Sequence, residues 1–224
     1  MLLNYLRTGE LVMPSDTAQR RELEVELDFY QFEHVPWPPP FHASLLLGLK
    51  EHRDKLIAWR NQAQQAQQAS GGTSTPAARG PVAARWRLLY RLTRDGAQSA
   101  ALRARCDSKG ETFLVAKSTQ GHLFGGYSST SWTSTAVADA KTFLFTLTNP
   151  CRIAPTQYRL SNSGSAAQAS HDQLTFGSGA DLRFGNPLTS ATCSQLLGAG
   201  SWGTSTLVGS PHIQVVELEV WGTK

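Results

Sequence analysis

The sequence predicts a protein of the α+β class that is mainly β, built as an antiparallel β-sandwich with flanking helices. From residue 85 onward, β-branched and aromatic runs bounded by turn residues follow one another at short spacing. Few helical patterns interrupt these runs, which favours packed antiparallel sheets. The chain has 224 residues, enough for one large domain or two small ones with a buried core.

The first segment, residues 1–33, predicts two short helices joined by a turn. Leucines recur at helical spacing before a Thr-Gly stop signal, and Ser15 or Asp16 can cap the second helix. So short a segment cannot bury a core alone. Residues 34–42 are predicted to be a proline-rich linker, because the four prolines of HVPWPPPF exclude regular helix and central strand. A ligand for proline-recognition domains is the alternative function of PWPPP.

A third helix is predicted over residues 44–65, with Ser44 as a candidate N-cap. Its apolar stripe is expected to consist of Leu45, Leu49, Leu56 and Trp59. Residues 62–83 contain almost no aliphatic side chain beyond alanine. We expect a flexible insertion rich in Gln, Ala and Gly over these residues.

The strand candidates follow the insertion. They are residues 86–92, 112–117, 122–128, 141–148, 172–176, 181–184 and 213–221. In the last run, Val216, Leu218 and Val220 are expected on one face, and Glu217 and Glu219 on the other, as in a half-buried strand. This alternation predicts that the two acids face solvent.

Glycines mark the sharp changes of direction. The Asp-Gly pair at residues 95–96 predicts a tight turn that leads into a short helix. The adjacent glycines at residues 125–126 lie within an apolar strand, where they predict either a bulge or a close backbone approach. The glycines of FGSG, residues 176–179, predict a bend before Asp181.

The charge is unevenly distributed along the chain. The net charge is +4, but residues 1–40 carry three basic and seven acidic side chains. The basic remainder could favour acidic partners, including nucleic acid or an anionic membrane. Its lysines and arginines are scattered, so a generally solvated surface is the preferred interpretation and no nucleic-acid partner is expected.

Other signals concern the compartment. No apolar run approaches the roughly 18 residues that span a bilayer, and the start lacks the pattern of a secretory signal. The three cysteines, Cys106, Cys151 and Cys193, are odd in number and widely spaced. These features predict reduced thiols and a cytoplasmic protein with no transmembrane segment.

Two glycine-containing stretches differ from the motifs of nucleotide-binding proteins. GHLFGGYSST matches neither a phosphate-binding loop nor a dinucleotide-binding fingerprint, and FGSGADL has a single GxG without a third glycine. No GxSxG nucleophile elbow occurs. The six histidines show no metal-ligand spacing. We expect no catalytic residue, no metal and no cofactor.

Two features keep a chemical role open. Glu217 and Glu219 are paired carboxylates that could do acid–base work or bind a cation, although solvent-facing acids are the preferred interpretation. Cys106 could be a peroxide-reactive thiol if Arg103 and Arg105 lowered its pKa. On a short helix it would instead pack inward as a small hydrophobic side chain.

Over residues 43–222, the sequence resembles the TLDc domain. The resemblance is carried by WRLLYR at 86–91, RDG at 94–96, FGGY at 124–127, FGSGADL at 176–182 and VELEVW at 216–221. Leu102 and Ala97 depart from the family pattern, and residues 185–212 match poorly. The resemblance implies that the signature positions are Asp95, Gly96, Phe124, Gly125, Gly126, Gly177, Gly179 and Asp181.

Residues 1–33 resemble the C-terminal part of a BTB/T1 domain of the potassium-channel tetramerisation type. LNYLRTG at residues 3–9 and ELDFY at residues 26–30 carry this resemblance, while the front half of that domain, including its sheet, is absent. A complete BTB domain would imply homo-oligomerisation. The chain is therefore expected to be a fragment or to start late.

Together the resemblances imply a non-enzymatic protein-interaction module. Members of the TLDc family are associated with protection from oxidative stress and with binding and regulation of the vacuolar proton-pumping ATPase. A cytoplasmic protein, at the periphery of endomembranes when docked, is the expectation. The alternatives are a peroxide-handling redox enzyme and a ubiquitin-ligase adaptor that acts through the BTB portion.

Overall fold

The computed structural model describes residues 16, 18–19, 22–23, 25, 40–68, 86–133, 139–159, 168–169, 173–177, 181–193 and 207–223. The chain divides into one unit of Met1–Ala43 with Ala77–Arg85, and a second of Ser44–Pro76 with Trp86–Lys224. The predicted BTB-like helices and proline-rich linker lie almost wholly outside the described residues, as does the predicted insertion beyond residue 68. These assignments stay predictions.

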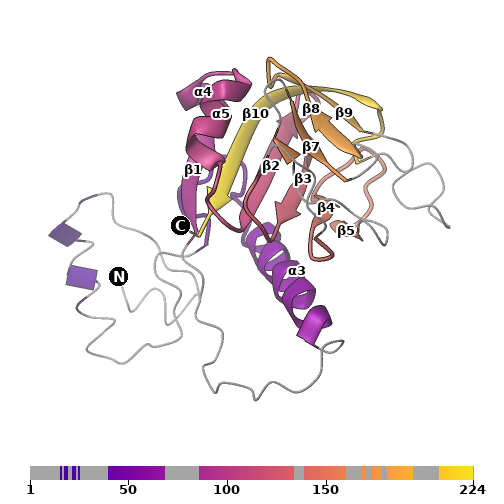
Figure 1. The fold of residues 1–224 in the computed structure, drawn as a ribbon. Helices are drawn as coiled ribbons and strands as arrows, with labels where there is room; N and C mark the ends of the chain where they lie inside the picture. Colours follow the sequence, from indigo (N-terminus) through magenta and orange to yellow (C-terminus); the bar gives the residue numbers. More distant parts are fainter. Residues whose placement is uncertain are drawn as a thin grey trace. The chain divides into compact units, whose positions relative to one another are not determined.

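The second unit is mainly antiparallel β-sheet, which confirms the predicted class (Figure 1). Its ladder has the order β5-β4-β3-β2-β10-β9-β8-β7-β6, and β1 pairs separately with β10. The strands are β1 Arg87–Arg91, β2 Thr112–Ser118, β3 Leu123–Ser128, β4 Phe143–Thr146, β5 Thr156–Arg159, β6 Gln168–Ala169, β7 Leu174–Phe176, β8 Leu182–Phe184, β9 Ser190–Cys193 and β10 His212–Gly222. The described strands form one continuous ladder, and the predicted two-sheet sandwich stays a prediction.

Strand β10 connects the two halves of the ladder and contains a bulge. Val215 pairs with Ser118, and Glu217 pairs with the preceding residue of β2, so Val216 is the extra residue. The bulge reverses the alternation of the strand. Val216 is therefore 44% exposed, and its predicted place on the inward face with Leu218 was wrong.

The interior core lies on one face of β2, β3 and β4 and is closed by later strands of the same ladder. The rings of Phe124 in β3 and Phe184 in β8 stack with centroids 6.3 Å apart. The core also takes in two helices, α4 (Leu92–Asp95) and α5 (Ser99–Cys106), through Leu92 and Leu102. The predicted short helix after Gly96 is thus present, and Gly96 has a φ of 88°.

The opposite face of β2, β3 and β4 carries an aromatic layer under helix α3 (Lys50–Gln68), which Figure 1 shows next to these strands. The ring of Trp59 lies 6.5 Å from Phe143 and 6.2 Å from Phe145. The layer consists of Trp59, Trp86, Phe113, Tyr127, Phe143 and Phe145. We call this side the helix-covered face.

Helix α3 begins six residues later than the sequence predicts. Ser44 does not cap it, because its hydroxyl accepts the backbone N–H groups of Leu46 and Leu47 in a separate turn. Gly48 also disfavours an earlier helical start. Leu45 and Leu49 consequently lie outside the helix and are 67% and 59% exposed, so they do not belong to its buried stripe.

Candidate functional site

The carboxylate of Glu219 accepts five hydrogen bonds. The side chain is fully buried on β10, in the same cross-strand row as Gly125 of β3 and Phe145 of β4 on the helix-covered face. Its Oε2 accepts the hydroxyl of Ser44 at 2.5 Å and the indole N–H of Trp221 at 3.2 Å. Both donors compensate the carboxylate for the loss of water.

The second oxygen of Glu219 completes the network. Oε1 accepts the backbone N–H of Leu45 at 2.9 Å and both Nε and Nη2 of Arg91, at 3.0 and 2.8 Å. Arg91 lies directly across from Glu219 in the β1–β10 pair. The carboxylate therefore connects strand β1 to the turn that precedes α3. We call Ser44, Leu45, Arg91, Glu219 and Trp221 the Glu219 network.

Glu217 is a second buried acid, with a side chain that is 7% exposed. It accepts the hydroxyl of Thr93 at 2.6 Å, the backbone N–H of Thr93 at 3.3 Å and that of Leu218 at 2.9 Å. The prediction that both acids face solvent was therefore wrong. The alternation in β10 separates the two faces of the strand, but helix α4 and the turn at Ser44 cover the face that carries the acids.

The buried acids do not form a cation site. The oxygens of Glu219 are occupied by N–H and O–H donors, and so are those of Glu217. In the part of the chain that the structure describes, no group of three or more His, Cys, Asp and Glu side chains could hold a metal ion. The two carboxylates thus act as anchors in this structure.

Asp95 extends the Glu219 network toward helix α5. It accepts hydrogen bonds from the backbone N–H of Arg91 at 2.9 Å and from Nη2 of Arg94 at 2.7 Å. It also forms an ion pair with Nη2 of Arg105 at 3.1 Å. The hydrogen bond from Arg94 is the main cause that holds the pKa of Asp95 below its usual range. Arg91 therefore contacts Asp95 through its backbone and Glu219 through its side chain.

Cys106 lies in the interior core and is fully buried. Burial raises the pKa of its thiol far above the ordinary value, which opposes formation of a reactive thiolate. The neighbouring arginines are engaged elsewhere, since Arg103 pairs with Asp107 at 3.0 Å and Arg105 pairs with Asp95. The arrangement that would activate Cys106 is absent among the described residues.

The paired glycines of β3 serve close packing on both faces of the strand. The register with β2 is regular through both residues, so the predicted bulge does not occur there. A Cβ on Gly125 would lie 1.9 Å from the carbonyl oxygen of Leu114, and one on Gly126 would lie 2.7 Å from the ring of Phe176. The close approach is the reason for these glycines.

The remaining signature positions are also structural. Phe124 belongs to the interior core. Gly177 has a φ of 84°, and a Cβ there would lie 1.9 Å from the carboxylate of Asp181. Gly179 and most of residues 185–212 beyond Cys193 lie outside the described residues. Among the described positions, Asp181 is half-buried, and the others are glycines or have largely buried side chains.

A further polar cluster attaches α3 to the sheet. Arg60 donates two hydrogen bonds to Glu111, at 2.7 and 3.0 Å. Glu111 also accepts the hydroxyl of Tyr127 at 2.8 Å, and Gln64 donates to that hydroxyl at 3.1 Å. This cluster was not predicted from the sequence, and neither were the contacts of Ser44 and Arg91 with Glu219. In each case the interacting residues are far apart along the chain, and no spacing rule connects them.

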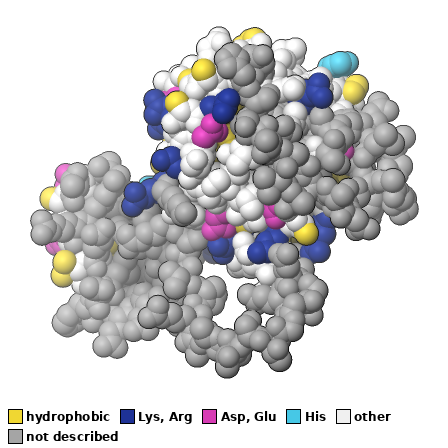
Figure 2. Space-filling model, viewed as in Figure 1, with side chains coloured by type: hydrophobic (Ala, Val, Ile, Leu, Met, Phe, Trp, Pro, Cys, Tyr) yellow, Lys and Arg dark blue, Asp and Glu magenta, His cyan; other side chains and the backbone are white. Residues whose placement is uncertain are grey.

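Five carboxylates of the second unit are largely removed from solvent, whereas its described lysines and arginines are half-buried or exposed. The acids with side chains largely removed from solvent are Asp95, Glu111, Asp139, Glu217 and Glu219. Figure 2 shows Lys and Arg side chains at several separate places on the displayed face. The surface is therefore more basic than the composition of this unit indicates.

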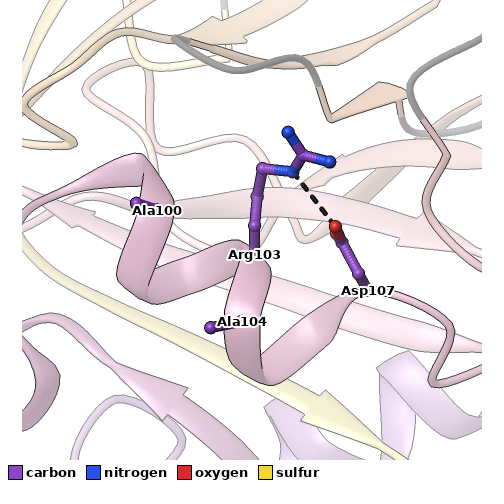
Figure 3. Close-up of a pocket in the computed structure, with 4 residues that line it drawn as sticks. All are labelled: Ala100, Arg103, Ala104 and Asp107. Carbon is purple, nitrogen blue, oxygen red and sulfur yellow. Dashed lines mark hydrogen bonds and ion pairs between the residues drawn. The ribbon is translucent and has the colours of Figure 1, made fainter.

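A cavity of about 370 Å³ opens beside helix α5. The described residues that line it are Ala100, Arg103, Ala104 and Asp107. Figure 3 shows the two alanines along one flank of the helix and the guanidinium of Arg103 joined to Asp107. Small side chains on an exposed flank leave room for a group from another molecule.

Comparison with known proteins defines the class of this one. The TLDc domain family matches residues 75–224, so the chain belongs to the TLDc family. The chain is also similar to MTOR-associated protein MEAK7 from Danio rerio, with 28% identity over 151 residues. That alignment covers 61% of this chain and 32% of the relative, so the chain spans about a third of the length of the curated relative it matches.

The family match adds limits to the earlier interpretations. It does not reach residues 1–33, so the BTB-like resemblance stays a prediction. Ser44 and α3 precede the match but pack on it through Glu219 and Trp59. Among the described residues, no helix is long and apolar enough to cross a membrane.

Proposed function

We propose that the TLDc unit is a non-enzymatic protein-interaction module that binds the vacuolar proton-pumping ATPase and influences its assembly. The observation that carries the proposal is that its candidate chemical groups are committed to internal contacts. Glu219 is buried under five hydrogen bonds, and Cys106 is buried in the core. A unit so arranged offers its surface, rather than a reactive centre, to other molecules.

Membership of the TLDc family supports this role, because the family is associated with that pump and with protection from oxidative stress. The protein would act in the cytoplasm, on the surface of endomembranes that carry the pump. Protection from oxidants would then follow from control of the pump rather than from chemistry at Cys106. If a longer chain contains a complete BTB domain, self-association would raise the apparent affinity for the partner.

The name of the zebrafish relative refers to association with mTOR. An mTOR complex is therefore a second candidate partner. The two partners are distinguishable because each can be purified and presented to the same immobilised protein.

Binding of the full chain to the purified peripheral sector of the pump tests the proposal. We expect saturable binding with a Kd in the micromolar range or tighter, about the range of many regulatory contacts. Binding to an mTOR complex is measured in parallel. No detectable binding at protein concentrations of about tens of micromolar would contradict the proposal.

The enzyme alternative is tested by peroxide consumption. We expect the wild-type chain to consume hydrogen peroxide no faster than a denatured sample with the same number of thiols. Cys106→Ala is the matched variant, since it removes the core thiol at little cost in volume. Catalytic turnover that is lost in Cys106→Ala would overturn the non-enzymatic proposal.

A further inference from the structure

Helices α4 and α5 carry two exposed cations that are held by one acid. Arg94 and Arg105 both form ion pairs with Asp95, whose side chain is only 3% exposed, whereas the two arginine side chains are 45% and 50% exposed. The buried carboxylate thus fixes both guanidinium groups at the surface. Arginine carries five donors, and the contacts to Asp95 use only some of them.

The positions of these arginines are fixed before any ligand binds. Arg94 contacts both oxygens of Asp95, at 3.0 and 2.7 Å, and also the carbonyl oxygen of Leu89 at 3.1 Å. The low pKa of Asp95 keeps its charge in place over the ordinary pH range. Because the side chains are already ordered, a ligand that pairs with them loses less conformational entropy on binding.

The local charge is positive. Residues 94–109 carry four cations, Arg94, Arg103, Arg105 and Lys109, and two acids, Asp95 and Asp107. The cavity lined by Ala100 and Ala104 lies on the neighbouring flank of the same helix. Cations next to a cavity suit a ligand that combines carboxylates with an apolar side chain.

We propose that this α5 surface, consisting of Arg94, Arg105 and the cavity at Ala100 and Ala104, binds an acidic segment of a partner protein. Carboxylates of the segment pair with the guanidinium groups, and an apolar side chain enters the cavity. A cavity of about 370 Å³ has room for a side chain, which favours a peptide over a flat anionic membrane. The inference rests on the proposed interaction role and names the surface that performs it.

The test uses the full chain and a fluorescein-labelled peptide of glutamates with leucine at its centre, measured by fluorescence anisotropy. The decisive pair is Ala104→Glu and Ala104→Gln, which match in size and differ in charge. Ala104 is exposed on α5, so both variants are expected to melt at the same temperature. We expect Ala104→Glu to bind the peptide about tenfold more weakly than Ala104→Gln.

A second pair controls for charge in general. Arg105→Gln removes one oriented cation, while Arg159→Gln removes an exposed cation from β5, which lies at the far end of the ladder from β10. We expect weaker binding and a smaller salt dependence for Arg105→Gln only. Equal affinities of the Ala104 pair, or equal losses for the two arginine variants, would overturn the proposal.

Two further measurements separate the possible outcomes. Vesicles of phosphatidylcholine with phosphatidylserine replace the peptide, and binding to them alone, with the same variant dependence, would overturn the protein-partner proposal. The Ala104 pair is also tested on the peripheral sector of the pump. Equal pump binding by both variants would show that the α5 surface is not the pump contact, but it would leave the proposed function intact. No pump binding by the wild-type chain would refute only the proposed function.

Discussion

The two faces of strands β2, β3 and β4 are closed in different ways. The interior core is covered by β7, β8 and β9, which continue the hydrogen-bonded ladder, and its contacts are mostly apolar. The helix-covered face is closed by α3, which belongs to no ladder. Polar contacts supplement its aromatic contacts. Glu219 accepts hydrogen bonds from the turn before the helix, and Glu111 accepts them from Arg60 within the helix.

The difference shows where buried charge is useful in this fold. A strand added to a ladder has its orientation fixed by backbone hydrogen bonds, so side chains need only fill space. A helix on a sheet lacks such bonds, and aromatic packing by itself permits sliding. The Arg60–Glu111 ion pair and the hydrogen bonds from the turn at Ser44 to Glu219 attach α3 to the sheet, at the cost of a strong dependence on each partner.

The largest expected effect comes from removing the anchor of the helix-covered face. Glu219→Ala leaves Arg91 buried without its carboxylate, and we expect a loss of about 3–5 kcal/mol in the free energy of unfolding. Chemical denaturation measures this loss. Hydrogen exchange of the variant should increase more in α3 than in β7 and β8, and Glu51→Ala, an exposed control on α3, should cost less than about 0.5 kcal/mol.

A uniform increase in exchange across both faces would contradict this comparison. It would indicate that the Glu219 network stabilises the whole unit instead of attaching the helix.

The adjacent glycines of β3 allow the packing of the two faces to be compared, because Gly125 lies on the helix-covered face and Gly126 faces the interior core. Gly126→Ala meets the ring of Phe176, which can shift, and overpacking of this kind costs about 1–3 kcal/mol. Gly125→Ala meets the backbone oxygen of Leu114, which cannot move without disturbing the ladder. We expect Gly125→Ala to have the lower melting temperature of the two. The opposite order would place the tighter packing in the interior core.

His52 gives the helix-covered face a pH dependence. It is buried on α3, its Nδ1 has no hydrogen-bond partner among the described residues, and burial lowers its pKa, with Glu51 opposing the shift. Since the folded state binds the proton less well, stability should fall as the pH drops from about 6.5 through the lowered pKa. His52→Leu should lose this part of the dependence in melting curves between neutral and mildly acidic pH. An unchanged slope would exclude His52 as its source.

The smallest effect concerns the thiols. Cys106 and Cys193 are buried in the interior core, and burial raises the pKa of Cys193 to about 11, whereas Cys151 is exposed. We expect one thiol to react rapidly with Ellman's reagent in the native protein and all three after denaturation. Cys151→Ser should abolish the rapid phase. A rapid phase that survives this substitution would indicate an interior core that opens easily.

Periodicity located seven of the ten described strands and the short helix after Gly96, because these depend on local alternation and turn chemistry. It missed the short strands β5, β6 and β9. It placed the beginning of α3 too early, because the turn at Ser44 is held from outside by Glu219. It also failed for Glu217 and Glu219. Alternation assigns the acids to one face of β10, but only the segments that cover this face decide whether it is wet or dry.

The candidate site was therefore predictable in part. The signature positions from Asp95 to Asp181 could be found from sequence, since glycine and turn motifs are local. Their physical roles could not, because the atoms that forbid a Cβ at Gly125 belong to β2, and the ring that forbids one at Gly126 belongs to β7. The Arg60–Glu111 pair has no sequence signal, as its partners are brought together by the packing of α3.

Patterns within short stretches of chain were enough to predict the mainly β class, the positions of most strands and turns, and the family. The tertiary structure alone decided which side chains are buried, which acids hold the helix and which cations remain at the surface of α5. Burial and pairing depend on groups that are distant in sequence, and their energies arise only when packing removes water from between them.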